Sequence, residues 1–480
     1  MRAKKIFQWI VVSLVLLLLS SCNQELIADI AIIHVNLIPM NNDVVLENQT
    51  VLIAGETIVG IGKTGDIKFS KNVKVINGNG GYLMPGLADM HMHTRADWED
   101  PQIWPVHPLY LYLSNGVTTI RDFSPYGSPI NYALKWRKEI SEGKRIGPTI
   151  YASGELLYAS PMKDPKGIVD RNHELGFDFL KIYSFLSKED LQKVITEAEL
   201  LGMYTAGHIP YSVGLDGVLS EGMDEIAHVE ELLFEFIQFD RDRQLTSEEW
   251  MTYLAESAVL QFGLNLSAGN TGFFEENEES LQKISKLLRS KDIPVSTTMV
   301  IDDIIQMKLF KPEEFLSRSE NQYLESGYIE RYQLGEEKHQ IQCKDVEALC
   351  AYKYEIDRWI LRGLHSEDVL LLLGTDSGTG GMGIIPGYSI HDELQILIEN
   401  GFTPFEALET ATVNPAIVVE RMIGEGNFGT IEIGNHADLI LVARNPLANI
   451  ETIRKPLGVM AGGMWISAEM LSKLVDSPDF

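Results

Sequence analysis

Short apolar segments alternate with helix-like segments along the middle of the chain, from about Pro85 to Ile423. Strands separated by helices predict a parallel sheet, and eight strands in about 340 residues fit a (β/α)8 TIM barrel. The candidate strands are LADMHMH (87–93), VTTIRDF (117–123), TIYASG (149–154), DFLKIY (178–183), MYTAGH (203–208), EIAHVE (225–230), PVSTTM (294–299) and LLLLGTD (370–376).

The two ends of the chain carry a shorter period, in which apolar residues alternate with polar ones between Gly or Asn turns. This pattern runs from Ile27 to about Val75 and returns after Gly426. Neither end has enough strands to bury a sheet face alone, so one β-sandwich built from both ends is the economical prediction. The expected domains are a sandwich at 22–84 and 426–480 and an inserted, metal-binding barrel at 85–425.

Two stretches of the middle segment are harder to place. Residues 260–269 (LQFGLNLSAG) fit either a ninth strand or part of an insertion. The long Glu-rich stretch at 312–353 predicts helical cover over the barrel mouth.

The N-terminus has three positive charges, a mostly apolar stretch from Ile6 to Leu19, and small residues before Cys22. This pattern predicts a secretory signal at 1–21, and its apolar core is shorter than the ~20 residues of a membrane-spanning helix. The segment LSSC (19–22) resembles a bacterial lipobox, which implies cleavage before Cys22 and lipid attachment to its thiol. We therefore expect an exported lipoprotein, anchored on the periplasmic or cell-surface side of the inner or outer membrane.

Composition narrows the class of partner. With 45% hydrophobic and 22% charged residues, the 480-residue chain is ordinary globular protein. The net charge of -28 argues against nucleic acid, because affinity for phosphate backbones comes largely from Lys and Arg. Cys343 and Cys350 remain in the body of the chain, where they either form a disulfide or lie free on a helix two turns apart.

Two histidines close the first predicted barrel strand. Residues i and i+2 of a strand point the same way, so His91 and His93 present two imidazoles side by side. Taken alone, the pair also fits two ordinary histidines near a surface. Its place at the carboxyl end of a barrel strand, where active sites lie, favours a metal site.

Three more strands carry metal-binding side chains at the same level, namely His208, His228 and Asp376. Nitrogen and carboxylate ligands suit zinc-like ions, and three or four of them leave room for a reactive water. Singly, each has another explanation, a satisfied core histidine or a helix N-cap. Their recurrence at strand ends indicates a shared site.

Lys181 in DFLKIY stands out because a lysine flanked by Phe, Leu and Ile in a buried strand carries a poorly solvated charge. One explanation is an ion pair or an amine that reaches solvent along its apolar stem. The other is a functional role at the site formed by the neighbouring strand ends.

The chain resembles the amidohydrolase superfamily, closest to its imidazolonepropionase-like and prolidase-like branch. The motifs that carry the resemblance span nearly the whole mature chain and suit the superfamily better than any one substrate. They are LMPGLADMHMHT, GVTTIRDF, DFLKIY, AGH, IAHVEE, LLGTDSG, PFEALETATVNPA and GTIEIGNHADLILVARNPL. The resemblance implies a TIM barrel with a small β-sandwich, in agreement with the pattern of strands.

The resemblance also implies a two-metal centre, with zinc as the expected ion. On this model His91, His93 and Asp376 bind one ion, His208 and His228 bind the other, and a carbamylated Lys181 bridges both. A hydroxide shared by the two ions then attacks the scissile carbonyl, and Asp376 passes its proton to the leaving amine. The expected reaction is hydrolysis of an amide or peptide bond in a small molecule or dipeptide.

Two further residues are weaker candidates. Tyr211, three residues past His208, has a phenol that could hydrogen-bond a developing oxyanion, or it packs as an ordinary tyrosine. Arg121 could clamp a substrate carboxylate, or pair with Asp122 or another acid at the barrel mouth.

Three activities compete. The first is a two-metal peptidase or amidase with a prolidase-like preference, and the second is a one-metal hydrolase or deaminase of cyclic amides or amidines. Related deaminases have Glu where this chain has Tyr211, which favours the first. The third is a non-catalytic lipoprotein that binds ligands in a retired barrel, and the presence of all six ligand positions argues against it.

Overall fold

The computed structural model describes residues 26–123, 132–267, 272–379 and 381–476. The predicted signal at 1–21 and the lipid attachment at Cys22 lie outside these residues. Within the described part of the chain, no helix combines the length and the apolar character that crossing a membrane requires.

Each of the eight predicted barrel segments contains a strand, and the strands pair in parallel. A three-stranded sheet has the order β6-β7-β8, and a six-stranded sheet has the order β14-β13-β12-β11-β10-β9. The strands are β6 (Leu87–Met92), β7 (Val117–Asp122), β8 (Thr149–Ala152), β9 (Leu157–Ala159), β10 (Phe179–Phe185), β11 (Tyr204–Gly207), β12 (Glu225–Ile226), β13 (Val295–Ser296) and β14 (Leu371–Leu372).

Both outer edges of the two parallel sheets are linked by single bridges. Ser153, just past β8, bridges to Phe179 of β10, and Met92 of β6 bridges to Ser377, which follows β14. Hydrogen bonds reinforce the second link, since Met90 N donates to Leu373 O at 2.9 Å. The first and last parallel strands are therefore neighbours.

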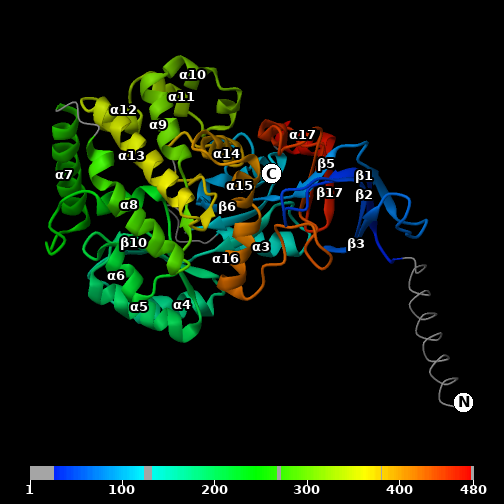
Figure 1. The fold of residues 1–480 in the computed structure, drawn as a ribbon, viewed down its shortest axis with the longest axis horizontal. Coiled ribbons are helices and arrows are strands. Elements are labelled where there is room, and N and C mark those ends of the chain that lie inside the picture. Colours follow the sequence, from blue (N-terminus) through cyan, green and yellow to red (C-terminus); the bar gives the residue numbers. More distant parts are fainter. Residues whose placement is uncertain (1–25, 124–131, 268–271, 380, 477–480) are drawn as a thin grey trace, which may run out of the picture.

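Helices separate and cover these strands, as Figure 1 shows. Local signals set their ends: the Ser187 side chain caps α5 and Gly202 ends it in a left-handed conformation. The helices are α2 (Pro108–Ser114), α3 (Tyr132–Ser141), α4 (Pro165–Glu174), α5 (Lys188–Leu201), α6 (Gly214–Glu221), α7 (Ser247–Ser267), α8 (Gly272–Ser290), α9 (Val300–Phe310), α10 (Pro312–Ser317), α11 (Tyr328–Gln333), α12 (Lys338–Cys343), α13 (Glu347–Ser366), α14 (Ser389–Glu399), α15 (Pro404–Glu409), α16 (Val413–Ile423) and α17 (Ala468–Asp476), with 3-10 helices η2 (Ala96–Glu99), η3 (Val229–Glu235), η4 (Ser319–Tyr323) and η5 (Ile450–Arg454).

The two ends of the chain meet in one additional sheet, where Figure 1 places the blue and red strands together at one end of the molecule. β5 pairs in parallel with β1 and antiparallel with β15, so it joins the two halves. The strands of both chain ends belong to one hydrogen-bonded sheet of eight strands. The strands are β1 (Ile30–Leu37), β2 (Leu46–Ala54), β3 (Thr57–Lys63), β4 (Lys74–Asn77), β5 (Tyr82–Pro85), β15 (Leu439–Val442), β16 (Gly458–Ala461) and β17 (Met464–Ser467).

The possible ninth strand at 260–269 is helical instead, because residues up to Ser267 belong to α7. Its apolar positions serve a helix that buries only a few large side chains, among them Trp250, Leu254 and Phe262. Leu260 and Leu264 are more than 60% exposed, so the apolar stretch that suggests a strand is partly surface. The Glu-rich stretch at 312–353 is largely helical, as predicted.

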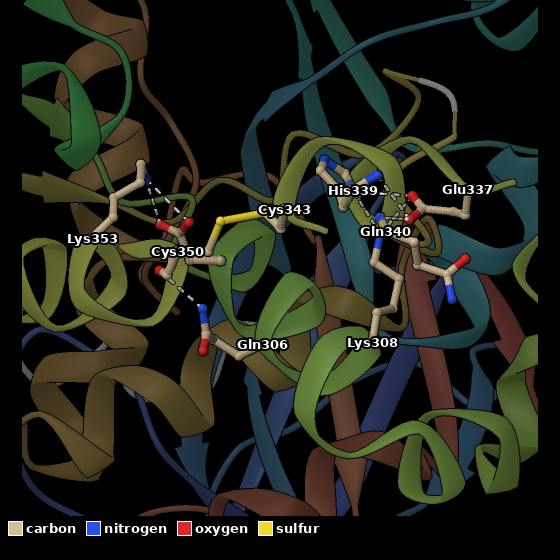
Figure 2. The surroundings of a disulfide bond; sticks show 9 residues. Gln306, Lys308, Glu337, His339, Gln340, Cys343, Cys350 and Lys353 are labelled. Carbon is tan, nitrogen blue, oxygen red and sulfur yellow. Dashed lines mark hydrogen bonds and ion pairs between the residues drawn. A yellow bond between two sulfur atoms is a disulfide. The ribbon is translucent and has the colours of Figure 1, made fainter. Parts of the chain in front are cut away.

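Buried charge and a disulfide fasten this helical region together (Figure 2). The Lys308 ammonium on α9 donates to Glu337 Oε1 at 2.9 Å and to the Met382 carbonyl at 2.9 Å, and its Nζ lies 2.7 Å from His339 Nδ1. Cys343 and Cys350 form a disulfide, which decides between the two states left open by the sequence. α12 and α13 are therefore tied to each other and to the loop that contains Met382.

We predict that Leu439→Ala destabilises the protein by about 2–5 kcal/mol, because Leu439 is fully buried where the two chain ends pair. Urea unfolding of the mature protein measures the change. Ile433→Ala is the matched control, since Ile433 is 66% exposed and its loss should change stability by under about 0.5 kcal/mol. Equal effects of the two substitutions would contradict the assignment of Leu439 to this joint core.

Candidate metal centre

The carboxyl ends of β6 and β14 place three candidate ligands together. Asp376 Oδ1 lies 3.1 Å from His93 Nε2 and 3.5 Å from His91 Nε2. The Asp376 amide donates to the His91 carbonyl at 2.7 Å, which holds the aspartate against β6. His91 is fully buried, whereas the side chains of His93 and Asp376 keep 13% and 10% exposure, so solvent reaches the group from the strand ends.

A buried aspartate of β6, Asp89, also holds the segment after β14 against β6. Asp89 accepts hydrogen bonds from Thr375 Oγ1 at 2.5 Å and from Thr375 N at 3.1 Å. Burial raises the pKa of Asp89 to about 7. On the other side, Gly378 has φ +91°, and a Cβ there would stand 1.8 Å from the His93 carbonyl oxygen. Only glycine lets this loop pass so close to His93.

His228 and His208 extend the cluster from β12 and β11. The ring centroids of His91 and His228 are 4.3 Å apart, and those of His228 and His208 are 4.9 Å apart. Donor atoms of His91, His228 and Asp376 all lie within 4.8 Å of one another. The five predicted His and Asp ligand positions are thus brought to one place by four different strands.

Two of these residues occupy unusual backbone conformations. His228 has φ 73° and Asp376 has φ 55°, in the left-handed half of the map that non-glycine residues seldom adopt. Such conformations cost of order 1–3 kcal/mol and persist where surrounding structure enforces them, most often at functional sites. Here each one turns a candidate ligand toward the others.

Hydrogen-bonding groups at Nδ1 orient the rings of His208 and His228. His208 Nδ1 lies 2.5 Å from Glu231 Oε1, while Glu231 Oε2 accepts the Ile209 amide at 3.0 Å. His228 Nδ1 lies 2.9 Å from Thr298 Oγ1. In each ring Nδ1 is engaged and Nε2 remains as the donor atom, the arrangement that protein metal sites use to fix ligand orientation.

The imidazoles are in the form that binds metal. Burial is the main cause that lowers the pKa of His91 and His208 well below the usual value and that of His228 to about 3. These rings are therefore neutral near pH 7, as ligation requires.

Lys181 lies among these groups with its amine buried. The residue is 1% exposed, and Nζ has no hydrogen-bond partner among the described residues. Nζ stands 4.6 Å from the Phe123 ring centroid, and burial lowers the pKa of Lys181 to about 7. Burying a polar group without a hydrogen bond is costly, and the Lys181 amine has no such bond among the described residues. A metal centre bound by the neighbouring imidazoles and carboxylate would supply the missing interaction.

Arg121 takes no part in this cluster. It is fully buried, its guanidinium forms a bidentate ion pair with Glu225, and its Nε donates to the Met90 carbonyl at 2.8 Å. The prediction of a substrate clamp is therefore corrected to a structural ion pair. The partner is Glu225 of β12 rather than the adjacent Asp122, which accepts hydrogen bonds from Thr94.

Tyr211 packs as an ordinary aromatic side chain. It is 6% exposed and its ring contacts those of Phe185, Phe234 and Trp250 at centroid distances of 5.7, 4.9 and 6.0 Å. Burial raises the pKa of Tyr211 well above its usual value. These contacts favour packing over a catalytic role for the phenol.

A second acidic cluster behind His228 is filled by a lysine. Glu230, Asp302 and Asp357 surround Lys353 Nζ at 2.8, 3.1 and 2.6 Å. The positive charge of Lys353 is the main cause that lowers the pKa of Glu230 to about 2. Lys353 of α13 thus braces η3, the segment that begins directly after His228.

Sequence reasoning missed the groups that orient the histidines. Glu231 lies in IAHVEE beside Glu230, and the sequence does not distinguish which carboxylate faces His208 and which faces Lys353. Thr298 carries no signal, because it contacts His228 only through the meeting of β12 and β13.

Comparison with known proteins agrees with this geometry. Residues 352–466, which include Asp376, match the amidohydrolase family. The chain is similar to this family over these residues, which make up about a quarter of its length.

Three known proteins are similar to this chain over most of its length. Ochratoxinase of Aspergillus niger is 23% identical over 500 aligned residues, covering 90% of this chain and 85% of that protein. A Xaa-Pro dipeptidase structure with bound methionine is 19% identical, with TM-score 0.60 over 91% of this chain and 99% of that one. A prolidase in complex with N-methylphosphonate-L-proline is 18% identical, with TM-score 0.62 over 91% and 99%. The two structures share the fold of this chain.

We predict that Glu231→Gln weakens metal binding about 10- to 100-fold, because the amide no longer offers His208 a carboxylate at Nδ1. Competition with a graded chelator series, followed by elemental analysis, measures the affinity. Glu248→Gln, an exposed substitution on α7, is the control and should leave it unchanged. Equal affinity in the two variants would exclude an orienting role for Glu231.

Proposed function

We propose that this protein cleaves the amide bond of a small molecule or dipeptide, with prolidase-like dipeptides as the first class to test. The observation that carries the proposal is the amine of Lys181, which has no hydrogen-bond partner within the described part of the chain and is buried among His91, His208, His228 and Asp376. A one-metal deaminase needs no such lysine. The names of the ochratoxinase and dipeptidase relatives support amide hydrolysis as the reaction class.

We further propose that the two parallel sheets form one (β/α)8 barrel. Support comes from the bridges at both edges, which make β8 a neighbour of β10 and β6 a neighbour of the segment after β14. All the candidate ligands then lie at the carboxyl ends of the barrel strands, where active sites of this fold are built.

In this proposal the residues divide between two divalent ions, expected to be zinc. His91, His93 and Asp376 would hold one ion, His208 and His228 would hold the other, and Lys181 would contribute a carbamate ligand. A neutral amine is the form that reacts with carbon dioxide, and the buried position of Lys181 favours that form. When bound, such ions activate a water and polarise a carbonyl.

Asp376 is the proposed proton carrier. Its Oδ1 faces His91 and His93, and its side chain retains 10% exposure, so the carboxylate stands between the ligand rings and the incoming substrate. From this position the carboxylate takes a proton from the attacking water and delivers it to the leaving amine. His91, at 0% exposure, closes the inner side of the site against bulk water.

We predict that Lys181→Ala reduces bound metal from about two ions per chain to one or none and abolishes hydrolysis of dipeptides and lactams, because the bridging group is lost. Elemental analysis of the purified mature protein, with a panel of dipeptides, lactams and lactones, measures both. Lys166→Ala, a surface substitution, should change neither. A single ion that the Lys181 substitution leaves in place would contradict the two-metal proposal.

We also propose that the protein is exported and held to a membrane through lipidated Cys22. The Cys343–Cys350 disulfide supports export, because disulfides persist in oxidising compartments.

In a bacterial host, we predict that the full chain fractionates with membranes and incorporates labelled fatty acid, whereas Cys22→Ala incorporates none. Cys343→Ser is the matched control and should keep both the label and the membrane fraction. Equal labelling of the wild type and Cys22→Ala would rule out this anchor.

A further inference from the structure

The aromatic side chains of Tyr183, Phe185 and Tyr158 form a surface that extends from the metal centre along β10. Alternate residues of a strand point to the same side, and Phe179 packs with interior residues while Leu180 and Ile182 pack with the outer helices. Lys181 therefore shares the interior side with Phe179. Beyond Ile182 the pairing with β9 shifts register, and Tyr183 and Phe185 are placed together by their rings, whose centroids lie 5.8 Å apart. Each step of two residues advances about 6.6 Å toward the open end of the strand.

Tyr183 is the link between the metal centre and this surface. Its ring lies 4.3 Å from that of His208, measured between centroids and tilted by 48°. The His208 side chain is 13% exposed, so the contact lies on the side of the centre that solvent reaches. A group attached to a substrate at the metal centre and directed past His208 would run along Tyr183.

Tyr158 extends the surface outward from a separate strand. β9 pairs in parallel with β10, with Leu157 opposite Ile182, so Tyr158 stands beside the end of β10. Its ring lies 5.0 Å from that of Tyr183 and 5.2 Å from that of Phe185, yet Tyr158 remains 46% exposed. Burial of this large ring is incomplete in the protein alone.

The buried layer beneath keeps these rings in place. Phe185 and Tyr211 pack with Trp250 and Leu254 of α7 in one apolar cluster. Arg241 fixes this layer from its edge by donating to the carbonyls of Tyr211 and Phe234 at 2.9 Å. Tyr183 and Tyr158 are thus the outer members of a supported aromatic stack.

We propose that Tyr158 and Tyr183 form a substrate subsite for an aromatic ring that lies within a few bonds of the scissile amide. The subsite rests on the proposed amide hydrolysis and narrows it to aryl-bearing amides or dipeptides with an aromatic residue. Offset or edge contacts between rings add to the effect of apolar burial, so an aromatic ring gains over a saturated one of similar size.

Pairs of substrates that differ only in an aromatic or a saturated ring isolate the contribution of ring–ring contacts to binding. One pair consists of N-benzoyl and N-cyclohexanecarbonyl amides of the same amine, and a second pair places phenylalanine or cyclohexylalanine on the amine side. In the metal-loaded wild type, KM for the aromatic member of at least one pair should be roughly 2- to 10-fold lower. No preference in either pair would overturn the subsite.

Variants at Tyr158 test the residue itself, because it is exposed and does not contact the histidines. Tyr158→Leu should abolish the preference through KM, while Tyr158→Phe should keep it. Phe310→Leu is the control, since Phe310 is 47% exposed at the far end of α9. Loss of preference in the Phe310 variant, or its survival in Tyr158→Leu, would contradict the proposal.

A binding measurement separates this inference from the proposed function. Calorimetric titration of the metal-loaded protein with 4-oxo-4-phenylbutanoate and 4-cyclohexyl-4-oxobutanoate, which have CH2 in place of the amide NH, compares binding of the benzoyl and cyclohexanecarbonyl groups without turnover. If no amide is hydrolysed, the proposed function fails, and tighter binding of the benzoyl compound, lost in Tyr158→Leu, still supports the subsite. Hydrolysis with equal binding of both compounds leaves the function standing and overturns the subsite.

Discussion

The candidate metal centre depends on one junction, the contact between β6 and the segment that follows β14. Asp89 and Thr375 are 286 residues apart in sequence, yet their side chains hydrogen-bond in the fully buried interior. The same segment returns its backbone to β6, where the His91 carbonyl accepts the Asp376 amide and Ser377 accepts the His93 amide at 2.7 Å. Without this junction the carboxylate and the first two imidazoles would have no fixed relation.

Much of this arrangement is readable in the chain because strand geometry is local. Because His91 and His93 are two residues apart in a strand, their side chains are predicted to point to the same side. Parallel strands also bring their carboxyl ends to one edge of the sheet. His208, His228 and Asp376 follow from the same rule. The sequence also shows that Lys181 is a charged residue in an otherwise apolar strand segment, since its neighbours in sequence are apolar.

What escapes sequence reasoning is contact between distant segments. Arg121 is visibly a charge in a buried strand, but its partner Glu225 lies 104 residues away and its choice depends on strand order. The same holds for Tyr211, whose environment comes from α7, a segment whose apolar residues also fit a strand. The single sheet of the chain ends depends on β5 pairing on both sides, which alternation alone does not specify.

Two lysines are among the contacts that attach the helical cover to the rest of the protein. Lys308 reaches the Met382 carbonyl in the loop after Asp376, and Lys353 reaches Glu230 beside His228. Between them, α10 to α12 contact solvent over much of their length, and the disulfide holds the end of this stretch to α13. For protein engineering, the exposed residues of this stretch can be replaced while its buried aromatic residues, Phe315, Tyr328 and Tyr332, keep it packed on the core and both lysines stay in register.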